Sequence, residues 1–151
     1  AMIRALSSLA NGGILPHPHV VSAIKYDSGI TRAIDTPEGK RVITSHTAST
    51  VTSMLVKVFD KDLLKGALKQ EHYSIAAKTG TAQIPRPGGG YYGDTYLHSF
   101  FGYFPAHDPR FIVFLFALEP HGQTYASATL ARPFMDITQF LINYYNIPPD
   151  R

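Results

Sequence analysis

The sequence has no cysteine, no long apolar run and no cluster of charge of one sign, and each absence excludes a class of protein. Without cysteine there is no disulfide scaffold, no thiolate metal site and no cysteine nucleophile. The longest strictly apolar run, Phe111 to Leu118, is too short to cross a bilayer. The 14 lysines and arginines are scattered, with no run longer than Lys40-Arg41, so we expect no nucleic-acid partner.

What is present is typical of one globular domain. The chain has 151 residues, of which 44% are apolar and 17% charged, enough to bury a sizeable core. Near the start, Met2, Ala5, Leu6 and Leu9 recur at helical spacing, and Asn11-Gly12-Gly13 ends that helix. No capping residue precedes it, so we interpret the 151 residues as part of a longer chain.

The remaining pattern alternates between strands and helices. We predict strands over Val20 to Tyr26, Tyr73 to Ile84, Phe100 to Phe104 and Phe111 to Leu118, and helices over Ser45 to Phe59 and Leu130 to Tyr145. Met54 falls on the apolar face of its helix, and we expect Phe116 and Tyr145 to face the core. Because the last strand is apolar throughout, the sheet should be covered on both faces by helices. The sequence therefore predicts an α+β fold, an antiparallel sheet covered by helices.

One segment carries candidate chemistry: Ala76-Ala77-Lys78-Thr79-Gly80-Thr81-Ala82-Gln83. Lys-Thr also ends a phosphate-binding P-loop, but that loop requires glycine where this chain has Ala77 and His72. A phosphate site on Gly88-Gly89-Gly90 lacks a following helix to bind the anion. Two interpretations are left, an ordinary edge strand or the Lys-Thr-Gly box of penicillin-interacting serine enzymes.

The chemistry of a substrate cleft suits the second interpretation. Alternate side chains of a strand lie on opposite faces, so Lys78 and Gly80 share one face, and Thr79 and Thr81 share the other. A glycine lets a substrate peptide lie against the backbone at position 80. Lysine and threonine side chains can bind a carboxylate, and a strand N–H can stabilise an oxyanion.

The segments around this box resemble the C-terminal half of the transpeptidase domain of class B penicillin-binding proteins. The matching segments are Met2 to Gly13, Lys78 to Gln83, Gly89 to Tyr91, Ser99 to Pro105, Asp108 to Phe111, and the Ala131-Pro133-Phe134 helix leading to Ile147-Pro148-Pro149. Their order and spacing run along essentially the whole chain. The Ser99-Phe100-Phe101-Gly102 run favours the cell-division type over the cell-elongation type. One departure is Ala77, where the family commonly has glycine.

The resemblance implies a partial penicillin-binding-protein/β-lactamase-like fold and a peptidoglycan D,D-transpeptidase that forms a serine acyl-enzyme and binds β-lactams. By resemblance, Lys78 assists proton movement, and the hydroxyls of Thr79 and Thr81 bind the terminal carboxylate of a D-Ala-D-Ala stem peptide. The Thr81 backbone N–H supplies half of the oxyanion hole. Gly80 lies against the substrate, and Gln83 borders the acceptor side. No cofactor and no metal is implied.

The chain lacks the other motifs that this reaction needs. It contains no Ser-x-Asn, and its one Ser-x-x-Lys, Ser22 to Lys25, falls in a predicted strand, where residues three apart point in opposite directions. We therefore predict that residues 1–151 are the C-terminal portion of one transpeptidase domain, with the nucleophile on a missing upstream part. Alone, these residues should be inactive, because nucleophile, base and oxyanion donors must converge.

The resemblance also implies partners and a location. The expected partners are peptidoglycan stem peptides, β-lactams, the upstream half of the same domain and cell-division proteins. The expected location is the extracytoplasmic face of the bacterial cell membrane, with an N-terminal anchor helix outside this chain. A β-lactam sensor and a non-catalytic scaffold are the alternatives with the same fold. Tyr91, Tyr92 and Tyr96 either shape a substrate cleft or only pack, and the sequence leaves both open.

Overall fold

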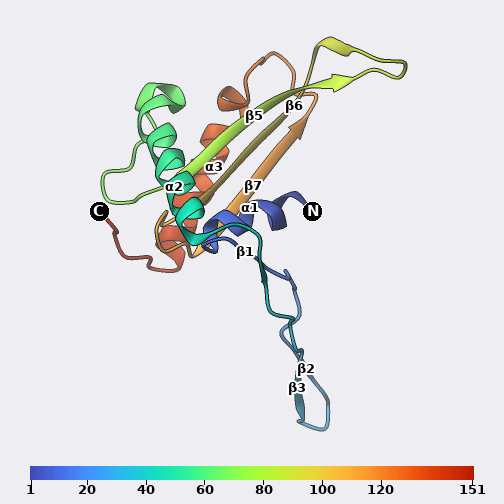
Figure 1. Cartoon of the computed structure of the whole chain (residues 1–151), viewed down its shortest axis with the longest axis vertical. Helices are drawn as coiled ribbons and strands as arrows, with labels where there is room; N and C mark the ends of the chain where they lie inside the picture. Colours follow the sequence, from blue (N-terminus) through green and yellow to red (C-terminus); the bar gives the residue numbers. More distant parts are fainter.

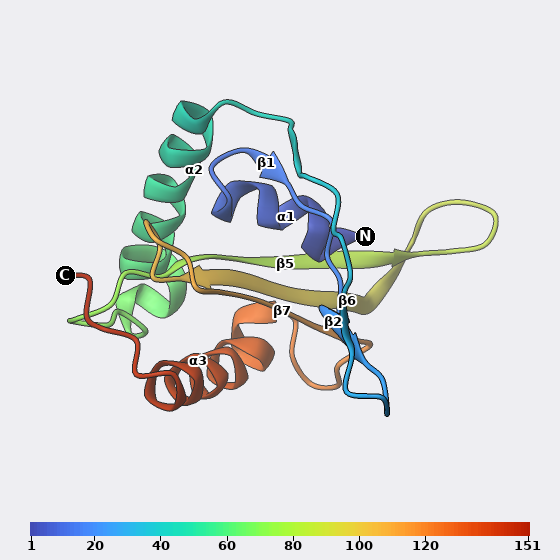
Figure 2. The same cartoon turned by 90° about the horizontal axis from the view of Figure 1, so that it is seen from below.

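The computed structural model describes residues 1–151 and has a three-stranded antiparallel sheet at its centre (Figure 1). The strands are β5 (Ala76–Pro85), β6 (Tyr91–Phe104) and β7 (Phe111–Leu118), in that order, so β6 is central. Helix α3 (Ala126–Tyr144) packs on one face, and α1 (Met2–Ala10) and α2 (Ser45–Lys57) lie on the other (Figure 2). The predicted fold, an antiparallel sheet covered by helices, is confirmed. No helix combines the length and the hydropathy that a membrane crossing requires.

The core lies on both faces of β6, because successive side chains of a strand alternate. Phe100 points toward α3 and stacks on Phe134, with ring centroids 4.4 Å apart. Tyr103 points toward the opposite face, where its buried hydroxyl lies 2.7 Å from that of Thr52 on α2. Burial raises the pKa of the Tyr103 phenol, while the hydrogen bond to Thr52 opposes that rise. The central strand therefore joins both helical layers.

Gly102 allows α3 to approach the sheet closely. A Cβ at this position would lie 2.6 Å from the Phe134 ring, 2.9 Å from the Ala77 Cβ and 3.0 Å from the Ala76 carbonyl oxygen. Phe134 and Ala77 are both fully buried, so neither has room to retreat. The absence of a side chain at residue 102 thus sets the spacing between β5, β6 and α3.

Helix α3 begins four residues earlier than the sequence predicts. Its N-cap residue, Tyr125, makes no side-chain cap. The Ala126 N–H instead donates to the Thr81 hydroxyl, 3.0 Å away on β5. A cap supplied from another strand leaves no local signal in the sequence, which explains the wrong boundary. At the other end, Tyr145 is the C-cap and is 55% exposed, so its predicted inward position is wrong.

Two further burial predictions are wrong for reasons of tertiary packing. Met54 is exposed, because α2 buries the side that carries Ala48 and Thr52 instead. Phe116 is 67% exposed, because β7 is an edge strand and α1 covers only part of its face. The bounds of β7 are confirmed, whereas β6 begins at Tyr91, well before the predicted Phe100.

Residues 14–41 form an arm that projects away from the sheet (Figure 1). At its base β1 (Ile14–Leu15) pairs with β4 (Lys40–Arg41), and farther out β2 (Ala23–Lys25) pairs with β3 (Thr31–Ala33), both antiparallel. The strand predicted over Val20 to Tyr26 is therefore real but shorter, and all of its paired residues are exposed.

Between α2 and β5 the chain makes two tight turns. A π-helical turn, η1 (Val58–Asp62), runs into a 3-10 turn, η2 (Leu63–Gly66). Leu64 and Lys65 have positive φ angles of 47° and 56°, which non-glycine residues rarely adopt. These turns lie beside β5 and reverse the chain before it enters the sheet.

Candidate active site

The Lys-Thr-Gly box lies on β5, which pairs with β6 on one side and has an open edge on the other. The Glu119 N–H donates to the Tyr96 carbonyl, so the backbone groups of Tyr96 face β7. In an antiparallel sheet these directions alternate along a strand. The odd-numbered residues of β6 from 97 to 103 therefore face β5, opposite the even-numbered residues 76–82.

The register leaves the backbone groups of Thr79, Thr81 and Gln83 at the open edge of β5. These residues alternate with Lys78, Gly80 and Ala82, whose backbone groups are directed toward β6. Apart from the Thr79 carbonyl oxygen, which accepts from the Lys78 ammonium, these groups are open to an extended peptide that adds to the sheet.

The side chains of the box divide between the two faces. Lys78 and Gly80 share the face of α1 and α2, and Thr79 and Thr81 share the face of α3, as the strand period predicts. The Lys78 ammonium bends toward the strand and donates to the Thr79 carbonyl oxygen, 2.8 Å from Nζ. The Lys78 ammonium and the two threonines therefore lie along the same stretch of the open edge of β5.

Thr81 contacts α3 in a way that the sequence did not predict. Its Oγ1 accepts from the Ala126 N–H, which leaves the hydroxyl proton free to be donated. The positive end of the α3 dipole lies at the same point, since Ala126 is the first residue of that helix. A free hydroxyl proton next to a helix N-terminus is a favourable environment for an anion.

Gly80 also lies close to a side chain of the neighbouring strand. A Cβ at this position would lie 2.6 Å from the Ser99 Oγ on β6. Because the serine hydroxyl can rotate away, this contact alone does not require a glycine, and the expected contact with a substrate stays a prediction.

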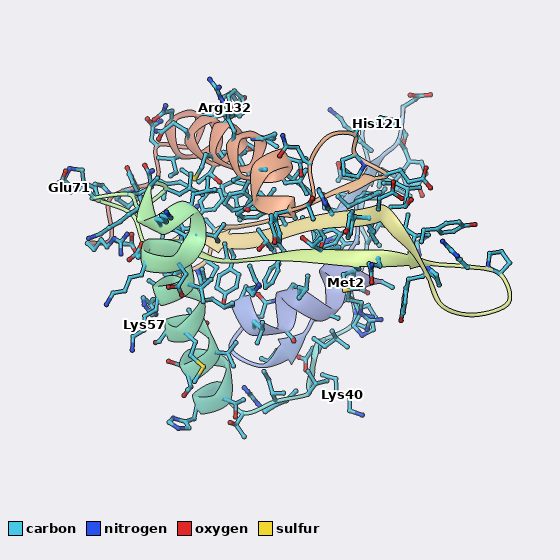
Figure 3. All side chains as sticks on the ribbon, turned by 90° about the horizontal axis from the view of Figure 1, so that it is seen from above. Met2, Lys40, Lys57, Glu71, His121 and Arg132 are labelled. Carbon is cyan, nitrogen blue, oxygen red and sulfur yellow. The ribbon has the colours of Figure 1, made fainter.

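Two cavities flank Lys78, one on each side of the box. The first, about 520 Å³, lies on the α1 face and is mainly apolar; its walls include Met2, Leu6, Phe101 and Phe116. Met2 is labelled beside β5 in Figure 3. The second, about 320 Å³, lies between η1, η2 and the start of α3.

The second cavity contains residues that the sequence analysis missed. Besides Lys78 and Thr79, Asp62, Leu64 and Ser127 line it. The left-handed turn at Leu64 and the cap that sets the start of α3 bring Leu64 and Ser127 there. Neither feature has a sequence pattern that could have identified these residues.

The Ser-x-x-Lys sequence at Ser22 to Lys25 lies elsewhere. Ala23–Lys25 form strand β2 at the far end of the arm, and β5 lies in the body of the molecule (Figure 1). The expected strand is confirmed. The serine and lysine are therefore not on one face of a helix, which a nucleophile and its base at this spacing require.

A box of this type on the edge strand of a helix-covered antiparallel sheet is typical of penicillin-interacting enzymes. The family model described as "Penicillin binding protein transpeptidase domain" matches residues 1–139. The chain belongs to this family, and its relatives place it with the class B members.

Several relatives are similar over most of the chain. It is 33% identical to penicillin-binding protein PbpB of Mycolicibacterium smegmatis, over 97% of this chain and 24% of that protein. It is 28% identical to stage V sporulation protein D of Bacillus subtilis, over 88% of this chain and 21% of that protein. The chain thus spans about a quarter of the length of these curated relatives.

Solved structures show the same fold. Penicillin-binding protein 3 of Mycobacterium tuberculosis, in its apo form, superposes with a TM-score of 0.84 at 30% identity. The match covers 99% of this chain and 36% of that chain. The same protein complexed with ampicillin superposes with a TM-score of 0.83 at 28% identity, over 99% of this chain and 35% of that chain.

Proposed function

We propose that this chain forms the carboxylate-binding and oxyanion side of the active site of a peptidoglycan D,D-transpeptidase. The observation that carries the proposal is the open edge of β5. At that edge the N–H and the hydroxyl proton of Thr81 lie next to the N-terminus of α3. Such donors match a terminal carboxylate and an acyl carbonyl on which negative charge develops.

Each residue of the box has a role in this proposal. The Thr79 and Thr81 hydroxyls bind the terminal carboxylate of a D-Ala-D-Ala stem or of a β-lactam. The Thr81 N–H donates to the oxyanion, and Lys78 assists proton movement. Gly80 lies against the substrate, and Gln83 borders the acceptor side farther along the same edge.

The serine nucleophile belongs to an upstream part of the same domain in this proposal. Its attack on the penultimate D-Ala carbonyl forms the acyl-enzyme and releases D-alanine, and the amine of a neighbouring stem then takes the acyl group. By itself the chain lacks a nucleophile and is inactive. The relatives named PbpB and FtsI homolog support a role in cell division. That role implies an extracytoplasmic location and a membrane anchor outside this chain.

The experiment measures acylation by a fluorescent penicillin in the full-length protein that contains this chain. Lys78→Ala should slow acylation by at least about 100-fold, the usual range for losing a group that moves protons. The matched control is Lys25→Ala, which removes another exposed strand lysine, the one that follows Ser22. It should acylate at the unmodified rate.

Two results would contradict the proposal. One is full-length protein that is never acylated by penicillin. The other is a penicilloyl adduct on the 151-residue chain, found by intact mass after incubation with benzylpenicillin. That adduct would place a nucleophile among the serines of these residues.

A further inference from the structure

His98 on β6 is the only fully buried histidine of the seven in the chain. Its partner across the sheet is Thr81 on β5. Because the backbone groups of Thr81 are directed to the open edge, the two residues form a non-hydrogen-bonded pair, in which opposite Cβ atoms lie about 4.5–5.5 Å apart. Both side chains contact α3. The His98 ring therefore lies beside the threonine that we propose binds a carboxylate.

Both ring nitrogens of His98 make hydrogen bonds at the start of α3. Nε2 lies 3.0 Å from the Thr124 carbonyl oxygen, and Nδ1 lies 2.9 Å from the Thr129 Oγ1. Because a carbonyl oxygen can only accept, Nε2 is assigned the hydrogen, and in the neutral ring Nδ1 accepts from the Thr129 hydroxyl. One tautomer thus satisfies both positions of a ring that has no contact with water.

These two hydrogen bonds lie on either side of Ala126, whose N–H donates to the Thr81 hydroxyl. Thr124 precedes Ala126 by two residues, and Thr129 follows it by three. The N-cap residue of α3 makes no side-chain cap, so neighbouring side chains of the sheet hold this end of the helix instead. His98 therefore fixes the position from which the Ala126 N–H reaches Thr81.

The position of the Ala126 N–H in turn decides where the Thr81 hydroxyl proton points. The Ala126 nitrogen lies 3.0 Å from the Thr81 Oγ1. While one lone pair of that oxygen accepts from the N–H, the hydroxyl hydrogen is turned away from this donor and stays available to a ligand. A displaced helix end would free the hydroxyl to rotate and would move the positive end of the helix dipole away from the site. His98 can thus affect a ligand that it does not touch.

We propose that His98 is a positioning residue for carboxylate binding: it holds the start of α3 so that the Thr81 hydroxyl donates to a ligand at the open edge of β5. This inference rests on the proposed function, because it requires a carboxylate at Thr81. A histidine that only stabilised the core would not act through this one hydroxyl, and that difference can be measured.

The test is a double-mutant cycle on the rate of acylation by fluorescent penicillin, in the full-length protein that contains this chain. His98→Ala removes both hydrogen bonds and should slow acylation by at least about tenfold, within the range that a misplaced binding group costs. In protein that already carries Thr81→Val there is no hydroxyl to orient. There the same substitution should slow acylation by less than about twofold, because the two residues act as a unit.

Two milder variants keep the test valid if His98→Ala does not fold. Thr129→Val removes one of the two hydrogen bonds and keeps the shape of the side chain, so it should slow acylation by about threefold, and only where Thr81 has its hydroxyl. His98→Gln places an amide nitrogen near the position of Nε2, from which it can donate to the Thr124 carbonyl. It should restore acylation to within about threefold of the unmodified rate.

The matched control is Phe134→Leu, which removes a buried ring from the same contact between α3 and the sheet but no hydrogen bond at the start of the helix. It should lower the free energy of unfolding and leave the acylation rate of the folded protein unaltered. An equally large loss of rate in Phe134→Leu would overturn the inference, because packing alone would then explain the effect of His98.

Two further results would overturn it. One is an unaltered acylation rate in His98→Ala, and the other is an equal loss of rate with and without the Thr81 hydroxyl. The unmodified protein separates the two proposals. If it is acylated but His98 and Thr81 show no coupling, only the positioning role is contradicted. If it is never acylated, the proposed function is contradicted as well.

Discussion

Replacing Gly102 with alanine should destabilise the protein by about 2 kcal/mol, the middle of the range for overpacking a core. The new methyl group would lie 2.6 Å from the Phe134 ring and 2.9 Å from the Ala77 Cβ, both fully buried. Phe134 cannot move away, because it stacks on Phe100 at 4.4 Å. Alanine loses less backbone entropy on folding than glycine does, which stabilises the variant by only about 0.5–1 kcal/mol, so the clash dominates.

The same strand offers a matched control, Gly93. A Cβ there would meet nothing within 4 Å, and its φ is not in the left-handed region. Gly93→Ala should therefore be neutral or slightly stabilising, by up to about 1 kcal/mol. Both variants change one hydrogen for a methyl group on β6, so they differ only in what surrounds it.

The assay is urea unfolding of the two variants beside the unmodified protein. A loss of 2 kcal/mol shifts the midpoint by about 1 M for a typical m-value near 2 kcal/mol/M. When Phe134→Leu is combined with Gly102→Ala, the double variant should lose less stability than the sum of the two single-variant losses, by at least about 0.5 kcal/mol. If Gly102→Ala unfolds at the same urea concentration as Gly93→Ala, the close approach of α3 to the sheet is not what stabilises this region.

Two further predictions concern hydroxyl groups. Thr81→Val removes the oxygen that accepts from the Ala126 N–H, so it should lower the free energy of unfolding by about 1 kcal/mol and slow acylation by penicillin. Thr81→Ser keeps the hydroxyl and should retain the stability and the acylation rate. Urea unfolding measures the stability, and labelling with a fluorescent penicillin measures the acylation rate. Burial raises the pKa of Tyr103 above its ordinary 10.0, so folded protein holds that proton more tightly than unfolded protein. The resulting stability is fully present below pH 10 and is lost as pH rises through the raised pKa. Tyr103→Phe should flatten this alkaline loss in urea midpoints; an equally steep loss would contradict the assignment.

The local elements of this protein could be predicted from its sequence because their signals are local. The apolar run from Phe111 to Leu118 coincides with β7, and the helical spacing after Met2 coincides with α1. The opposite faces of Lys78 and Thr79 follow from the period of a strand alone. The box alone fits two interpretations, and the order and spacing of the segments around it, which the sequence also contains, favour the family.

Only the tertiary structure decided which edge of β5 is open and what lies beside it. Pairing with β6 directs the backbone of Thr81 to that edge, and the Thr81 hydroxyl caps a helix 45 residues later in the chain. Phe116 is apolar but exposed, because burial depends on what covers a strand and not on its own sequence. Periodicity reports the conformation of neighbouring residues, whereas contacts between distant segments depend on how the whole chain packs.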